Sequence, residues 1–217
     1  MKRLAFLLPA LALCLLLAAC ASTPPDPVSE GQMPPSREEE NSPPEQEPAD
    51  PAAAEALSLE RLTVELVVDW KETDLLLAKL DTLSQLLREA LAAEGCLADE
   101  VTVTVSTAGG FTGQALAAGG VDIAWLPGID FLSCEDDAVP LLTAGQEETT
   151  CVAAVTLARE ELGDDFRQLL SRALLETEQG GEFLSLCPAA DEGYRPFTQD
   201  AMEALWDWAD SLEEAQG

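Results

Sequence analysis

The chain has 217 residues, of which 41 are acidic, 11 are basic and none is histidine, giving a net charge of −30. This charge repels nucleic acids and anionic lipid head groups, so we expect neither as a partner. Because the chain lacks histidine, a GxSxG elbow and a P-loop, we expect no catalytic residues, no cofactor and no enzymatic activity.

Residues 1–20 are typical of a secretory signal peptide. A basic start, Lys2-Arg3, precedes an apolar run over residues 4–19. The run ends in Leu17-Ala18-Ala19-Cys20, which resembles the lipobox of bacterial lipoproteins. We therefore expect lipidation at Cys20 and an extracytoplasmic protein anchored to the bacterial cell membrane by its N-terminal lipid. An uncleaved membrane anchor is the alternative, because the apolar run approaches the length of a membrane span.

Residues 21–57 are predicted to form a disordered, Pro/Glu-rich linker. The segment 21–56 holds nine of the 14 prolines, together with three consecutive glutamates and no aromatic residue. Such a segment buries too little apolar surface to offset the entropy lost on ordering. Its role is either to lift the folded part through a layer of the cell envelope or to act as a neutral spacer.

Residues 58–217 are predicted to form one α/β lobe. Strand and helix alternate through its first half, which favours a three-layer arrangement: a mainly parallel mixed sheet of about five strands with helices on both faces. The expected strands are 62–70, 101–106, 121–126, 139–143 and 151–157, and the expected helices are 74–94, 111–118, 163–178, 182–186 and 198–214.

The lobe is organised around the strand predicted over residues 121–126. A glycine pair precedes this short apolar run and Pro127-Gly128 follows it. A strand of this kind is buried on both faces inside a parallel α/β sheet. Because ligands bind beyond the carboxyl ends of such strands, we expect residues 127–131 at a ligand-binding edge.

Four cysteines remain in the lobe: Cys96, Cys134, Cys151 and Cys187. They are spaced too widely for a metal-binding knuckle, and no histidine could assist, so we expect no metal site. Export favours disulfide formation. Cys134 with Cys151 would close the shortest loop, which leaves Cys96 with Cys187. The alternative is four reduced, buried thiols.

Two motifs resemble the substrate-binding proteins of ABC importers, in particular the phosphate/phosphite/phosphonate-binding family of type II periplasmic-binding-protein-like fold. One is Gly120-Val-Asp-Ile-Ala-Trp-Leu-Pro127, and the other is Gly193-Tyr-Arg-Pro-Phe-Thr198 near the end of the chain. The resemblance implies a phosphonate-like small-molecule ligand and an ABC permease as partner. It also implies ligand contacts at two aromatic positions, which here are Phe111 and Phe131.

The likeness covers only one of the two lobes of that family. The segment 151–159 resembles the strand that leaves the first lobe, and residues 161–163 resemble the return from the second lobe. The second lobe, with the Ser/Thr-rich helix start that grips the phosphonate oxygens, is therefore expected to be absent. The ligand clamp would then be weakened or lost.

The expected ligand-binding residues are Trp70, Phe111, Pro127 and Phe131, all near the predicted edge. Each aromatic residue has a structural alternative. Phe111 and Phe131 could fill the core at helix starts, and Trp70 could cap the core at the end of its strand.

Two functions fit the sequence. The first is a solute-binding-type lipoprotein, a relative of an importer's receptor that binds a small ligand weakly or passes it on. The second is a cell-envelope lipoprotein without a transport role, which uses the lobe as a protein-interaction module.

Overall fold

Six strands form one sheet, with the order β2-β1-β3-β5-β4-β6, in the computed structural model, which describes residues 56–216. Strands β1, β2 and β3 are parallel, β5 is antiparallel to β3 and β4, and β6 is antiparallel to β4. The predicted α/β class with a mixed sheet is therefore confirmed. The strands are β1 (Leu57–Val67), β2 (Cys96–Ser106), β3 (Ile123–Pro127), β4 (Ala138–Ala144), β5 (Cys151–Thr156) and β6 (Arg195–Pro196).

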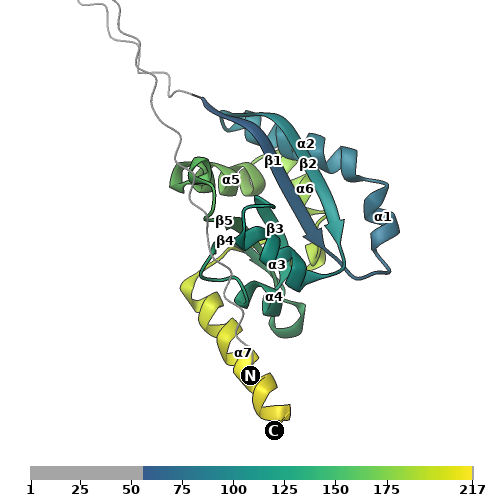
Figure 1. The fold of residues 1–217 in the computed structure, drawn as a ribbon. Helices are drawn as coiled ribbons and strands as arrows, with labels where there is room; N and C mark the ends of the chain where they lie inside the picture. Colours follow the sequence, from purple (N-terminus) through teal and green to yellow (C-terminus); the bar gives the residue numbers. More distant parts are fainter. Residues whose placement is uncertain (1–55, 217) are drawn as a thin grey trace, which may run out of the picture. The chain divides into compact units, whose positions relative to one another are not determined.

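Helices cover both faces of the sheet, as predicted (Figure 1). The first face carries α2, α5 and α6, and the second carries α3, α4 and α7. Each face has its own apolar core. The helices are α1 (Thr73–Leu77), α2 (Leu80–Ala93), α3 (Gly109–Ala117), α4 (Gly128–Leu132), α5 (Asp164–Glu176), α6 (Glu178–Leu184) and α7 (Gln199–Gln216), with short 3₁₀ turns η1 (Glu147–Thr149), η2 (Glu160–Leu162) and η3 (Ala190–Glu192).

Strand β3 is buried on both faces, as its apolar run predicted. Ile123 and Trp125 belong to the core of the first face, whereas Ala124 and Leu126 belong to the core of the second. The alternation follows from the two-residue period of a strand. Each of these four side chains is at most 1 % exposed, so β3 holds the two helical layers together.

The start of the lobe differs from the prediction. β1 begins at Leu57, five residues before the expected strand, and ends at Val67, which leaves Trp70 in the turn that follows. The early start is explained by pairing, since Leu57 is in register with Cys96 of β2. The helix expected over 74–94 is divided at Ala78 and Lys79 into α1 and α2.

The glycine pair Gly180-Gly181 lies within α6, where the sequence predicted a break between helices. The break is at Thr177, whose backbone is extended. Its hydroxyl donates to the Ala173 carbonyl oxygen at 2.6 Å and accepts from the Gly180 N–H at 2.9 Å. Thr177 therefore ends α5 and caps the start of α6.

The stripe expected on the last helix, over Met202, Leu205, Trp206, Ala209 and Leu212, is correct in part: Met202 and Leu205 contact the core, whereas Trp206 and Leu212 are exposed. Leu205 is buried against the second core, and Met202 and Trp208 pack beside it. Trp206 is 41 % exposed, and its indole N–H donates to Glu135. The contacting stripe is thus set by Leu205 and by side chains three residues away on either side.

The sheet has one long open edge, along β2. This strand of 11 residues pairs with β1 only. At its middle, the Ser84 hydroxyl of α2 accepts a hydrogen bond from the Val103 N–H at 3.2 Å. The opposite edge is the two-residue strand β6.

The predicted signal peptide (1–20) and nearly all of the predicted linker (21–57) lie outside the described residues, so the expected lipidation at Cys20 stays a prediction. Within residues 56–216, the helices are all too short or too polar to span a membrane.

Candidate functional site

The carboxyl ends of β1 and β3 meet the start of β5 at one edge of the sheet. Pro127, the last residue of β3, is in register with Cys151, the first residue of β5. Both residues line an open cavity of about 760 Å³, together with Val67 at the end of β1. This is the edge at which open α/β sheets bind ligands, and the volume is in the range of small-molecule sites.

Four segments wall this cavity, which we call the edge cavity: the β1–α1 turn with α1, the turn η1, the segment that follows α6, and the turn η3. Glu147 in η1 and Ala189 before η3 have φ of 51° and 58°, in the left-handed region that glycine favours. The lining residues are Val67, Asp69, Glu72, Leu75, Leu76, Lys79, Pro127, Glu148, Thr149, Thr150, Cys151, Ser185, Leu186, Cys187, Pro188, Ala189, Ala190, Asp191 and Glu192.

The charge of the edge cavity is strongly negative. Five lining residues are acidic and one, Lys79, is basic. No local sequence pattern marks these acidic residues, because each one alone is typical of a solvated loop side chain. Only the sheet order brings their loops together.

Cys151 and Cys187 form part of the cavity wall, and Tyr194 lies behind them. The Tyr194 hydroxyl is 3.7 Å from Cys151 Sγ and donates to the carbonyl oxygen of Pro188. Burial and the two neighbouring thiols raise the pKa of Tyr194 well above its usual range. The indole N–H of Trp125, fully buried in the same core, has no acceptor among the described residues.

All four cysteines of the lobe are buried free thiols in the structure, and neither predicted disulfide is formed. Cys134 lies in the core of the second face, whereas Cys151 lies in that of the first. The sheet therefore separates the two residues that loop length had paired. The structure instead places Cys151 and Cys187 in the wall of one cavity.

We expect the buried thiols to make the lobe less stable in alkali. Burial, with Asp137, Asp130 and Glu135 nearby, raises the pKa of Cys134 from 9.0 to about 11, and burial raises that of Cys151 to about 12. The folded state therefore keeps protons that the unfolded state releases, so this stability is complete below pH 9 and is lost as pH rises through 11 and 12.

Urea unfolding below pH 9 and near pH 11 measures the loss, and Cys134→Ala should lose less than the parent protein over this interval. An equal loss in both proteins would mean that Cys134 does not contribute.

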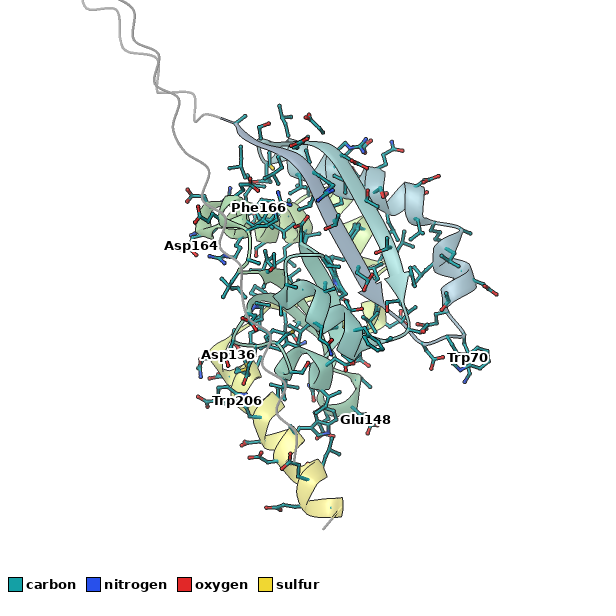
Figure 2. All side chains as sticks on the ribbon, viewed as in Figure 1. Trp70, Asp136, Glu148, Asp164, Phe166 and Trp206 are labelled. Atoms are coloured by element: carbon teal, nitrogen blue, oxygen red, sulfur yellow. The ribbon has the colours of Figure 1, made fainter. Side chains whose placement is uncertain are left out.

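The four expected ligand residues are in different environments. Pro127 lines the edge cavity. Phe131 is fully buried and packs edge-on against Phe197, with ring centroids 6.0 Å apart. Trp70 and Phe111 are 72 % and 76 % exposed and do not line the cavity. Figure 2 shows Trp70 pointing away from the sheet beyond the end of β1.

The start of α3 is occupied by a carboxylate of the chain itself. A side chain at Gly109 would overlap with Asp130, because the Asp130 carboxyl group lies directly against the Gly109 Cα. Burial raises the pKa of Asp130. The start of a helix stabilises an anion, and at the start of α3 this anion position is filled by the carboxyl group of Asp130.

The aspartate of the Gly120–Pro127 motif is at the opposite end of β3 from the edge cavity. Asp122 Oδ2 accepts from the Thr63 N–H at 2.7 Å and from the Thr63 hydroxyl at 2.9 Å. Its Oδ1 pairs with Arg159 Nη1 at 2.8 Å. The side chain of Asp122 is only 3 % exposed, so this residue joins β1, β3 and the segment after β5.

No group of His, Cys, Asp and Glu within residues 56–216 has the arrangement of a metal site. No protein-family model matches the chain, and no curated protein matches it significantly.

Solved structures are similar to this chain, and XAC2383 shares its fold. XAC2383 from Xanthomonas citri, bound to chloride ion in one structure and to ATP in another, matches with a TM-score of 0.53 and 10 % identity, over 72 % of this chain and 98 % of that chain. PhnD1 from Prochlorococcus marinus (MIT 9301), in complex with methylphosphonate, matches with a TM-score of 0.49 and 8 % identity, over 71 % and 98 %.

Proposed function

We propose that this protein is an extracytoplasmic, lipid-anchored lipoprotein that binds a small molecule in the edge cavity and is related to the substrate-binding proteins of ABC importers. The cavity of about 760 Å³ at the carboxyl ends of β1 and β3 carries this proposal. The fold it shares with XAC2383, a protein solved with ATP, is consistent with ligand binding. In this proposal the protein is a receptor without catalytic activity, and an ABC permease is its partner.

The phosphonate class that the motifs imply is disfavoured in this cavity. Five carboxylates against one lysine repel an anionic ligand. The cavity is also open, because no second lobe is present among the described residues to cover it. If a two-lobed receptor binds near 1 µM, losing half of its contact free energy leaves an affinity on the order of millimolar.

Calorimetric titration tests this function on the soluble Cys20→Ser chain. We expect methylphosphonate to bind no tighter than about 100 µM. The Ser185→Trp variant should lose the binding of any small molecule that the parent chain binds. Ser185 is an exposed residue of the cavity wall, so a tryptophan there would occupy part of the cavity. Gln168→Trp is the matched control, since Gln168 is exposed on α5 outside the cavity. Methylphosphonate binding with a low-micromolar dissociation constant, or ligand affinities that Ser185→Trp leaves unchanged, would contradict the proposal.

The proposed anchor depends on one residue, Cys20. Cys20→Ser should abolish lipid attachment and move the protein from the membrane fraction to the soluble fraction, because the lipid is the only membrane attachment in this proposal. Mass spectrometry of the mature N-terminus gives the direct measurement. An unmodified Cys20, or cleavage at another position, would exclude the anchor.

A second candidate function is a protein-interaction module without a transport role. It is supported by large apolar side chains that are exposed after the ends of β1, β2 and β3. Trp70, Leu75, Phe111 and Ile129 are each 46–76 % exposed. If this surface serves a partner protein, Trp70→Ser with Phe111→Ser should abolish that interaction and leave small-molecule titrations unchanged.

A further inference from the structure

We propose that the edge cavity binds an aliphatic amine that carries two or more ammonium groups. This inference rests on the proposed function, because it names the ligand class for the same cavity. The carboxylates around the cavity outnumber its single ammonium group by four. They are Asp69, Glu72, Glu148, Asp191 and Glu192, against Lys79.

The carboxylates come from three separate parts of the chain and meet only in the folded structure. Asp69 and Glu72 are in the turn after β1, Glu148 is in η1, and the remaining two are in η3. Figure 2 shows Glu148 at the loop between β4 and β5. Three loops that converge on one cavity with the same sign of charge focus the field inside it.

The charge of the cavity is not neutralised from within. The ion pairs of residues 56–216 use Asp122, Glu161, Asp164 and Glu94, none of which lines the cavity. Asp69 accepts a hydrogen bond from the Lys71 N–H at 3.0 Å, which still leaves its charge unpaired. A ligand that brings its own positive charges would therefore lower the repulsion among these carboxylates.

The walls between the charges are apolar and suit a methylene chain. Leu75, Leu76, Pro127, Leu186 and Pro188 contribute to them. An ammonium group on a flexible aliphatic stem can place its methylenes on such a surface while its charge stays near carboxylates and water. A simple metal cation would leave these apolar walls uncovered, so the lining favours an organic cation with an extended aliphatic part.

Titration calorimetry with 1,4-diaminobutane and spermidine tests the inference on the soluble Cys20→Ser chain. Both amines should bind, spermidine more tightly, whereas the neutral analogue 1,4-butanediol should not. Raising the salt concentration to about 0.5 M should weaken the binding, because screening acts on exposed charges.

Charge variants distinguish the cavity from the rest of the acidic surface. Glu72→Gln, Glu148→Gln and Asp191→Asn together should weaken amine binding by at least about tenfold. The control is the triple variant Glu176→Gln, Asp210→Asn and Glu213→Gln, which removes the same charge from exposed positions outside the cavity and should leave binding within about twofold. Lys79→Gln should tighten binding severalfold, a gain that a misfolded variant would not produce.

The outcomes separate this inference from the proposed function. Equal weakening by the two triple variants would overturn the inference, because amine binding would then reflect diffuse surface charge. If the amines do not bind, but a neutral or anionic ligand binds and loses its binding in Ser185→Trp, the inference is overturned and the proposed function is kept. If Ser185→Trp weakens the binding of no small molecule of any charge, both the inference and the proposed function are overturned.

Discussion

Replacing Asp122 by alanine is expected to lower the free energy of unfolding by about 2–4 kcal/mol. The substitution removes the acceptor of two Thr63 donors and the partner of Arg159. The loss is large because Asp122 is almost fully buried, so the donors it leaves behind have little access to water. Arg159 is 23 % exposed, which relieves part of the cost. Domains of this size are stable by only about 5–15 kcal/mol.

Glu161→Ala is the matched control for Asp122→Ala, because both carboxylates pair with Arg159. Glu161 Oε2 is 2.6 Å from Arg159 Nη2, but its side chain is 66 % exposed. An exposed pair contributes at most about 1 kcal/mol. Urea unfolding of the two variants gives the comparison. Equal losses would contradict the assignment of Asp122 as the buried centre of this network.

Gly180→Ala is expected to lower the free energy of unfolding by about 3 kcal/mol. A methyl group at Gly180 would overlap with the Ala173 carbonyl oxygen and lie 2.7 Å from the Leu174 Cα. Both atoms belong to the backbone of α5, which cannot rotate away as a side chain can. Helix α6 would have to move away from α5, and the packing of Phe183 against Trp125 would be disturbed with it.

The neighbouring glycine provides an internal control. A methyl group at Gly181 would meet no atom within 4 Å. Gly181→Ala should therefore stabilise the protein by about 0.5–1 kcal/mol, because alanine loses less backbone entropy in a helix. Thermal unfolding of the two variants should shift in opposite directions. A similar shift in both would mean that α5 and α6 do not pack as closely as the structure places them.

Local patterns in the sequence predicted most of the elements of this fold. The apolar run of residues 121–126 between a glycine pair and Pro127-Gly128 predicted β3, its burial on both faces and the ligand edge beyond it. Such patterns fail where a residue serves a distant partner. The break expected between residues 178 and 182 falls instead at Thr177, and Gly180 inside α6 is required by the backbone of α5.

The candidate site could be predicted only in part. Pro127 was expected at the edge and lines the cavity. The carboxylates of η1 and η3 could not be assigned, because no local pattern reveals that Glu148 and Asp191 lie on the same cavity. Likewise, Asp122 was visible only as a motif residue, and its pairing with Arg159 joins positions 37 residues apart. The disulfide predicted between Cys134 and Cys151 from the short loop between them is wrong, because the two thiols lie on opposite faces of the sheet.

The open edge of β2 has a consequence for how copies of this protein meet at high concentration. Unpaired edge strands are templates for aggregation, and this one is long. Two features oppose such growth: Ser84 already occupies the N–H of Val103, and Asp99 and Glu100 are exposed on the same strand. Two copies approaching edge to edge would bring these carboxylates close together. Although β2 is as long as any strand in the sheet, its edge therefore carries charges that oppose pairing with a second copy.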